Sequence, residues 1–360
     1  MIYFLIPICL LLFGIRYEYP DKKHLHSVMF SISLIILILF AGLRGDIEPD
    51  YISYKDIYDK AGQSINANVE IGYYLFNVVM HSLGLGFQWV IFFCAIFSLV
   101  PKFYFFKNHS SNYFIVLAFY YCSVFFLFDF IAIRQAIAIG IFMVSIPFII
   151  ERKISIYLFL IMIASLFHLS ALVLVPLYFI MHRSFSKLLM FCLLVVCSII
   201  NILKVKIGLL DYLLSFVSLP GFAAAKMDIY SLDDEFAALS IKQLVLGFLF
   251  VFYADKFKSN SILKALLNAY ILGVLIATFL NDIPQFAYRI KSYFLWADVI
   301  LLVEIVRIWS KSNKRKTIPL YILFVAFYCY TLYGFLDSIS QRGIFKDFIY
   351  PYVPFVWPIF

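Results

Sequence analysis

The sequence has 360 residues, of which 64% are hydrophobic and only 14% are charged, and its mean hydropathy is +0.96. A typical soluble domain has about 25% charged residues, so this composition excludes a soluble protein. The formal net charge of +8 is spread among apolar segments instead of gathering on one polar face, which argues against nucleic acid binding.

Long apolar runs indicate an integral membrane protein built from α-helices. A hydrocarbon core of about 30 Å takes roughly 20 apolar residues as helix, and a helix satisfies its own backbone hydrogen bonds. The runs do not alternate in polarity, which favours helices over a barrel of strands. We predict an all-α, polytopic fold in one membrane domain, residues 1–360, with candidate spans at residues 2–15, 28–43, 87–106, 113–128, 131–150, 154–181, 188–203, 239–254, 262–280, 290–308 and 319–336.

The run 154–181 decides the topology, because it has room for one tilted helix or for two short helices that meet near His168. Short loops rich in Lys and Arg stay on the cytoplasmic side. If the run crosses twice, more than half of the 29 basic residues fall in cytoplasmic connections, among them Lys102 and the KSNKRK segment at 311–316. We therefore expect about twelve transmembrane helices, with both termini outside.

Two long polar intervals, residues 44–86 and 205–238, face outwards in this topology. Within the first, a helix after Glu70 is expected to lie in the outer interface, because apolar residues recur there at helical spacing between polar flanks. Its apolar face would consist of Tyr73, Phe76, Val79 and Met80.

The same topology brings four cationic or titratable side chains to the outer face. They are Arg44, Arg134, His168 and Arg289. Charges near membrane spans are costly and therefore call for a reason. Guanidinium groups bind phosphate oxygens through two parallel hydrogen bonds and keep their charge, so this group is a plausible diphosphate site.

Three of these residues also have a purely structural interpretation. Arg134 could pair with Asp129, about one helical turn away, and Arg289 could extend to the interface beside Lys291. His168 could cap a broken helix, since its ring can be neutral or charged.

Acidic residues and tyrosines line the first outward interval. Asp46, Glu48 and Asp50 alternate, and Tyr51 and Tyr54 follow. One carboxylate could act as general base on a hydroxyl, several could hold a divalent cation, or the loop could simply be solvated.

No cofactor is expected from the sequence. It contains no HExxH, GxSxG or P-loop pattern, and the cytoplasmic loops are too short for a nucleotide-binding domain. The six cysteines lie in apolar runs without metal-ligand spacing, so we assign no metal site to them.

At these residues the sequence resembles the EpsG-like branch of the Wzy O-antigen and exopolysaccharide polymerases. The matching pieces occur in the expected order along the whole chain. They are GLRGDIEPDYISY at 42–54, EIGYYLFN at 70–77, IRQAIAIGI at 133–141, ASLFHLSALVLVPLY at 164–178, the segment around Arg289, and YPYVP at 350–354.

This resemblance implies a glycosyltransferase of the bacterial inner membrane with a GT-C-like polymerase architecture and an active site that faces the periplasm. It would transfer a growing glycan from undecaprenyl diphosphate to the sugar of the next lipid-linked repeat unit. Its partners would be these two lipid-linked oligosaccharides, the bilayer and a chain-length regulator protein, with no nucleic acid.

The resemblance also suggests residue roles. Arg134 and Arg289 would bind the diphosphate, with Arg44 and His168 as further donors, while Asp46, Asp50 or Glu70 would activate the acceptor hydroxyl. Substrate contacts are expected from Gln135, Tyr51, Tyr54, Tyr73 and Tyr288.

Other functions remain open at the level of sequence. A flippase for the same lipids would suit a dozen helices, although internal repeats and a central line of charges are missing. An O-antigen ligase would share the donor and differ in acceptor. An acyltransferase is disfavoured because no outward-facing nucleophile or paired-His motif is found.

Overall fold

The computed structural model describes residues 2–18, 23–48, 50–63, 69–208, 239–310 and 317–341, which form helices joined by turns. The all-α prediction is confirmed for these residues. The elements are α1 (Ile2–Tyr17), α2 (Lys23–Gly42), α3 (Tyr51–Asp59), α4 (Ile71–Ser82), α5 (Phe87–His109), α6 (Tyr113–Tyr120), the π-helix η2 (Tyr121–Ile131), α7 (Ile133–Ile150), α8 (Ile154–Phe167), the 3₁₀-helix η3 (Leu169–Leu174), α9 (Leu177–Ile180), α10 (Lys187–Leu203), α13 (Ile241–Phe252), α14 (Ala254–Phe257), α15 (Ser261–Phe279), α16 (Pro284–Leu295), α17 (Asp298–Ser310) and α18 (Thr317–Gln341).

Among the described residues, six helical stretches are long and apolar enough to cross a membrane. Stretches of this length and composition are stable in lipid because every backbone group is paired within the helix. The protein is therefore a multi-pass integral membrane protein. The six stretches are His24–Gly42, Phe87–His109, Tyr113–Ile131, Ile133–Ile150, Ser261–Phe279 and Thr317–Ser338.

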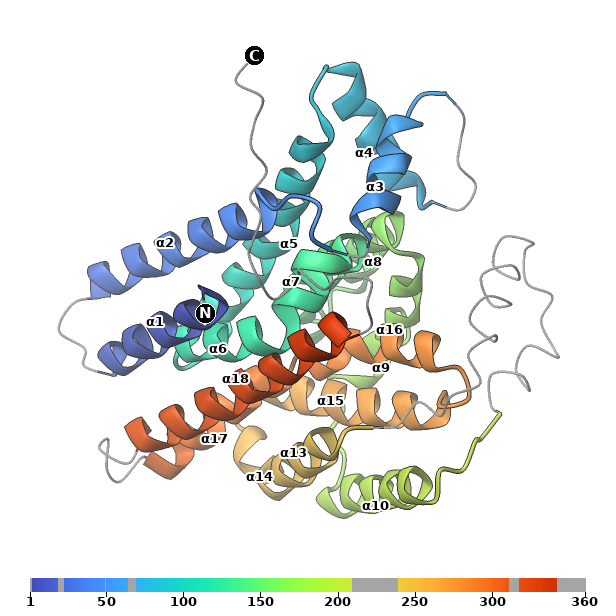
Figure 1. The fold of residues 1–360 in the computed structure, drawn as a ribbon. Helices are drawn as coiled ribbons and strands as arrows, with labels where there is room; N and C mark the ends of the chain where they lie inside the picture. Colours follow the sequence, from blue (N-terminus) through green and yellow to red (C-terminus); the bar gives the residue numbers. More distant parts are fainter. Residues whose placement is uncertain are drawn as a thin grey trace. The chain divides into compact units, whose positions relative to one another are not determined.

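The chain groups into two compact units. The first comprises Met1–Val144, Leu160–Leu169 and Val303–Phe360, and the second comprises Ser145–Phe159 and Ser170–Leu302. In the first unit α2 packs along α5 and α1 along α6, while α18 packs against α1 and η2 (Figure 1). In the second unit α15 packs against α10, α13 and α16.

The apolar run 154–181 is broken at His168, as the two-helix interpretation predicted. Helix α8 ends at Phe167, and η3 and α9 follow. The backbone N–H of Leu169 donates to Glu70 Oε1 at 3.5 Å, and Tyr157 Oη donates to the Leu174 carbonyl at 2.5 Å. The backbone groups freed by the break thus find partners in side chains, which is what a helix end inside a protein requires.

The segment 290–308, predicted as one span, is not one continuous helix. Helix α16 ends at Leu295 and α17 begins at Asp298. Trp296 Nε1 donates to the Tyr293 carbonyl at 2.7 Å, so the indole side chain satisfies a backbone acceptor in the last turn of α16. Asp298, expected in the middle of a helix, lies at a helix N-terminus 3.4 Å from Lys242 Nζ, where a carboxylate is favoured.

The helix expected after Glu70 is present as α4, and its place in the outer membrane interface stays a prediction. Tyr73, Asn77 and Met80 are buried, whereas Val79 is 49% exposed. Asn77 is accommodated because its amide donates to the Tyr73 carbonyl at 2.7 Å. Tyr73 and Met80 of the expected apolar face therefore pack inside the protein, while Val79 stays exposed.

Three sequence features lie outside the described residues. They are most of the second polar interval, the KSNKRK segment, and the YPYVP motif.

Candidate active site

Glu70, Arg134 and His168 come together in the first unit from three separate segments. Arg134 Nη1 donates to Glu70 Oε2, and His168 Nδ1 lies 3.4 Å from Glu70 Oε1. Three of the sequence-predicted site residues, separated by up to 98 positions, thus share one carboxylate.

Local structure explains why each side chain reaches this point. Glu70 is the extended N-cap residue of α4, and its carbonyl accepts the first helical hydrogen bond from Tyr74 at 3.0 Å. Arg134 lies in the first turn of α7, which begins after Ala132 ends the π-helix. His168 follows the last residue of α8 and donates its backbone N–H to Ala164. All three residues therefore lie at helix ends, where side chains can converge.

Gly72 allows α4 to approach the end of α8. A Cβ atom at this position would lie 2.7 Å from both Leu166 Cβ and the Leu166 carbonyl oxygen. Contacts this short with backbone cannot be relieved by a rotamer change. Because Gly72 and Leu166 are each two residues from the paired groups Glu70 and His168, this close approach sets the distance between them.

Two buried tyrosines hold the guanidinium of Arg134. Its Cζ lies 5.5 Å from the ring centroid of Tyr54 and 5.7 Å from that of Tyr73, within the range of cation–π attraction. The two rings pack edge to face at 5.7 Å. Burial raises the pKa of Tyr54 and of Tyr73, so both hydroxyls stay protonated at neutral pH. The tyrosines therefore provide rings and neutral hydroxyls around a fixed cation.

Arg134 is the accessible member of the group. Its side chain is 21% exposed, compared with 6% for Glu70 and 8% for His168. Within the described residues its Nε is buried without a hydrogen-bond partner. A partly exposed guanidinium with a donor to spare can bind an incoming anion.

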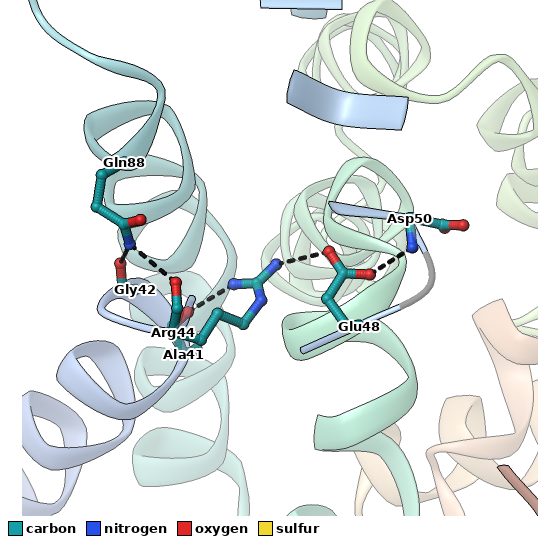
Figure 2. Close-up of polar contacts among 6 residues, drawn as sticks. All are labelled: Ala41, Gly42, Arg44, Glu48, Asp50 and Gln88. Atoms are coloured by element: carbon teal, nitrogen blue, oxygen red, sulfur yellow. Dashed lines mark hydrogen bonds and ion pairs between the residues drawn. The ribbon is translucent and has the colours of Figure 1, made fainter. Parts of the chain in front are cut away.

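Arg44 belongs to a different, fully buried cluster (Figure 2). It donates to the Ala41 carbonyl at 2.5 Å and to Glu48 Oε1 at 3.5 Å, and its Cζ lies 5.0 Å from the Phe130 ring centroid. Gln88 donates to the carbonyls of Gly42 and Arg44, at 2.6 and 3.2 Å. These hydrogen bonds satisfy carbonyls at the C-terminus of α2 that have no partner within the helix. A basic side chain near a helix C-terminus commonly plays this part.

Glu48 is buried beside Arg44 and accepts the backbone N–H of Asp50 at 2.7 Å (Figure 2). Burial raises its pKa to about 7, and Arg44 only partly offsets that effect. Glu48 therefore changes protonation near neutral pH, in a cluster that connects α2 to the start of α3.

The other acids of the first interval lie outside the Glu70 group. Asp46 is exposed, and Asp50 precedes α3 without a side-chain cap. Among the described residues, no three His, Cys, Asp or Glu side chains gather as a metal site would need. Of the three proposed bases, Glu70 alone is connected to Arg134 and His168 by the contacts described above.

Tyr51 and Gln135, two of the expected substrate contacts, are buried. Tyr51 packs edge to face on Phe87 at 5.2 Å, so its ring supports the base of α3. Gln135 follows Arg134 in the first turn of α7.

Arg289 and Tyr288 lie on α16 in the second unit. Tyr288 is 40% exposed and Lys291 Nζ lies 5.2 Å from its ring centroid. The role proposed for Arg289 and Tyr288 in substrate binding stays a prediction from sequence.

Asp129 does not pair with Arg134, so the structural interpretation of Arg134 from its neighbour in sequence is wrong. Asp129 Oδ1 instead lies 2.6 Å from Lys102 Nζ and accepts from Ser98 at 2.5 Å, while Tyr120 donates to Oδ2. Lys102 had been assigned to a cytoplasmic connection and is in fact fully buried. Its place inside the apolar run 87–106 was the signal that it needed a buried partner.

Comparison with known proteins supports a family assignment. A family model described as "EpsG family" matches residues 27–353. No curated protein and no solved structure matches the chain.

Proposed function

The chain belongs to the EpsG family, which suggests a role in exopolysaccharide biosynthesis, and we propose that it is the polymerase of that process. In this proposal it joins undecaprenyl-diphosphate-linked oligosaccharide repeat units on the periplasmic face of the bacterial inner membrane. The observation that carries it is the partly exposed Arg134, paired with the buried Glu70 beside His168.

The reaction needs both a leaving-group site and a base. The oxygen of an acceptor sugar hydroxyl attacks the anomeric carbon of the donor glycan, and the bond from that carbon to the diphosphate oxygen breaks. The electron pair leaves with undecaprenyl diphosphate, and the hydroxyl proton passes to a base. Cationic donors that stabilise the developing phosphate charge are the main requirement.

Arg134 and Glu70 together meet these two requirements. Arg134 would exchange the carboxylate of Glu70 for the donor diphosphate, since it has a donor that is unpaired within the described residues and is the accessible partner. Glu70, having lost its cation, would become a stronger base and accept the proton of the acceptor hydroxyl. His168 would hold Glu70 in place during the exchange.

Arg44 plays a supporting part in this proposal. Its guanidinium is fully buried and occupied by the end of α2 and by Glu48, so it would fix the start of the first polar interval without touching the donor. Arg289 remains our second candidate for diphosphate binding, on the basis of sequence alone.

The proposal includes a topology of about twelve crossings with both termini and residues 44–86 on the periplasmic side. Single cysteines at Ser184 and Ser312 test it. A membrane-impermeant thiol reagent should leave both unlabelled in intact cells and label both after the membrane is opened. Labelling of either residue in intact cells would overturn the topology.

The function is tested by deleting the gene and complementing it with wild type, Arg134→Ala or, as a matched control, the exposed Arg183→Ala. Surface glycan is then sized, and the amount of each variant in the membrane is measured. We expect long chains from wild type and Arg183→Ala, and a single repeat unit from the deletion and from Arg134→Ala, whose turnover should fall about 10²–10³-fold. Long chains from Arg134→Ala would contradict the assigned role.

The same deletion separates the alternative functions. Loss of all surface glycan, with full-length glycan retained on its lipid carrier, would indicate a ligase. Accumulation of the lipid-linked unit on the cytoplasmic side would indicate a flippase.

A further inference from the structure

An apolar groove lies between α5, α7 and the end of α8, within the first unit. Its volume is about 350 Å³, and every residue that lines it is apolar. The lining includes Phe97, Val100 and Pro101 of α5, Ile137 and Ile141 of α7, and Phe167. This volume is at the lower end of the range of about 300–1,000 Å³ that is usual for ligand sites.

One end of the groove meets the candidate active site. Phe167 directly precedes His168, and Ile137 lies one helical turn after Arg134. Both residues pack in the cluster that contains Tyr54 and Tyr73, the two rings that hold Arg134. A molecule bound to Arg134 through one end could therefore place its other end in the apolar groove.

The other side of the groove is open. Phe97 is 41% and Val100 is 42% exposed, and α5 and α7 are both long and apolar enough to span a membrane. Exposed side chains on such helices face lipid or neighbouring protein. A hydrocarbon chain could therefore enter the groove from the bilayer without exposing apolar surface to water.

Gly140 lets α7 pack closely against α5 next to Pro101, which lines the groove. A Cβ atom there would lie 2.8 Å from the Ser98 carbonyl oxygen and 3.5 Å from Pro101 Cβ. The close approach of α5 and α7 at this point therefore lies beside the larger side chains that line the groove.

We propose that this groove binds the isoprenoid chain of a polyprenyl-diphosphate-linked donor while Arg134 binds the diphosphate. The inference rests on the proposed function, and it adds the place where the lipid half of the substrate lies. The groove offers no hydrogen-bonding side chain, so a glycan would lose its hydroxyl hydrogen bonds there without replacement. A branched hydrocarbon has no such groups to satisfy and gains by burial.

Photo-crosslinking tests the location directly. p-Benzoylphenylalanine replaces Val100 in the groove or, as a matched control, Tyr104, which is 63% exposed one turn further along α5. The full-length protein is placed in nanodiscs with radiolabelled undecaprenyl diphosphate. We expect at least fivefold more labelling from position 100, and we expect excess unlabelled undecaprenyl diphosphate, but not excess phosphatidylglycerol, to remove it. Equal labelling at both positions, or equal competition by phosphatidylglycerol, would show an ordinary boundary lipid and overturn the proposal.

A second measurement uses retention of the same radiolabelled lipid by immobilised protein. Ile141→Trp fills the groove and should weaken binding about tenfold, whereas Tyr104→Trp should leave it unchanged. Unchanged binding by Ile141→Trp contradicts the groove. If Ile141→Trp does not fold, photo-crosslinking from position 100 of the otherwise native chain still tests the proposal.

Failure of the groove and failure of the proposed function give different results. If position 100 is labelled specifically but deletion of the gene leaves long glycan intact, the groove still binds the lipid and the proposed polymerase function is rejected. Loss of long glycan on deletion, together with unspecific labelling, would reject only the groove.

Discussion

Lys102 Nζ and Asp129 Oδ1 lie 2.6 Å apart, and neither side chain has any exposed surface. Lys102 also donates to Ser98 at 2.7 Å, and Tyr120 donates to the second carboxylate oxygen. The pair joins α5 to the π-helix, five residues before Arg134. It therefore fixes the segment from which α7 and its arginine begin.

Lys102→Met should strongly destabilise the protein, because it leaves the charge of Asp129 buried without its partner. Breaking a buried pair in this way costs about 3–5 kcal/mol. The thermal unfolding midpoint of the purified variant, compared with that of the wild type, measures the effect. The double variant Lys102→Met/Asp129→Leu should recover most of the loss, since replacing both partners removes the unpaired charge.

The exposed pair of Lys55 and Asp59 provides the control. Its Nζ–Oδ2 distance is also 2.6 Å, but both side chains are about half exposed. Lys55→Met should change the free energy of unfolding by less than about 1 kcal/mol. Equal midpoints for Lys102→Met and Lys55→Met would show that the buried pair is not ionic in the folded protein.

Glu70→Gln should abolish polymer formation while Glu48→Gln leaves it intact. Glutamine cannot accept the acceptor proton, and loss of a general base costs about 10²–10⁴-fold in rate. The Glu48 side chain is fully buried and that of Glu70 is 6% exposed, but Glu48 contacts Arg44 and not Arg134, so it controls for the removal of a buried carboxylate. The measurement is the length distribution of surface glycan at matched protein amounts. A similar loss in both variants would mean that buried charge, and not the position of Glu70, matters.

Gly72→Ala should move α4 away from α8 and so separate Glu70 from His168. The added Cβ would lie 2.7 Å from backbone and side-chain atoms of Leu166, a degree of overpacking that costs about 1–3 kcal/mol. We expect shortened glycan and a lower thermal midpoint. Gly86→Ala is the control, since a Cβ there meets nothing within 4 Å. Wild-type glycan from Gly72→Ala would show that the spacing tolerates this change.

Stability should depend on pH through Glu48. Burial raises its pKa from 4.5 to about 7 in the folded protein, so the folded state holds the proton more tightly than the unfolded state. Its contribution is therefore complete below pH 4.5, declines as pH rises towards 7 and is lost above it, with a total on the order of 3 kcal/mol.

Thermal midpoints of wild type and Glu48→Gln, measured between pH 4.5 and 8, test this dependence. Glutamine does not titrate, so the wild type should lose stability relative to the variant as pH rises. A constant difference across this range would show that Glu48 keeps one protonation state.

Hydrophobic runs predicted most helices well, because a segment that must pair its backbone in lipid has few choices other than a helix. The run 188–203 became α10 and the run 262–280 became α15. The break after Leu295 was missed because Trp296 ends α16 through a side-chain hydrogen bond that leaves no mark in hydropathy.

The candidate site was predicted in part. Glu70, Arg134 and His168 were named from sequence, and they share one carboxylate in the structure. The partners of Arg44 and Asp129 were not predicted. Asp129 pairs with Lys102 on another helix, and Arg44 pairs with Glu48 four residues along the chain, in a polar segment whose burial hydropathy does not reveal.

The sequence by itself determined that this protein is helical and lies in a membrane, since composition and periodicity act along the chain. Its motifs carried the resemblance to the EpsG family. Only the tertiary structure decided that Arg134 pairs with Glu70 and that Lys102 is buried against Asp129. The physical reason is that pairing and burial depend on the distance between segments far apart in sequence, which close contacts such as that of Gly72 with Leu166 set.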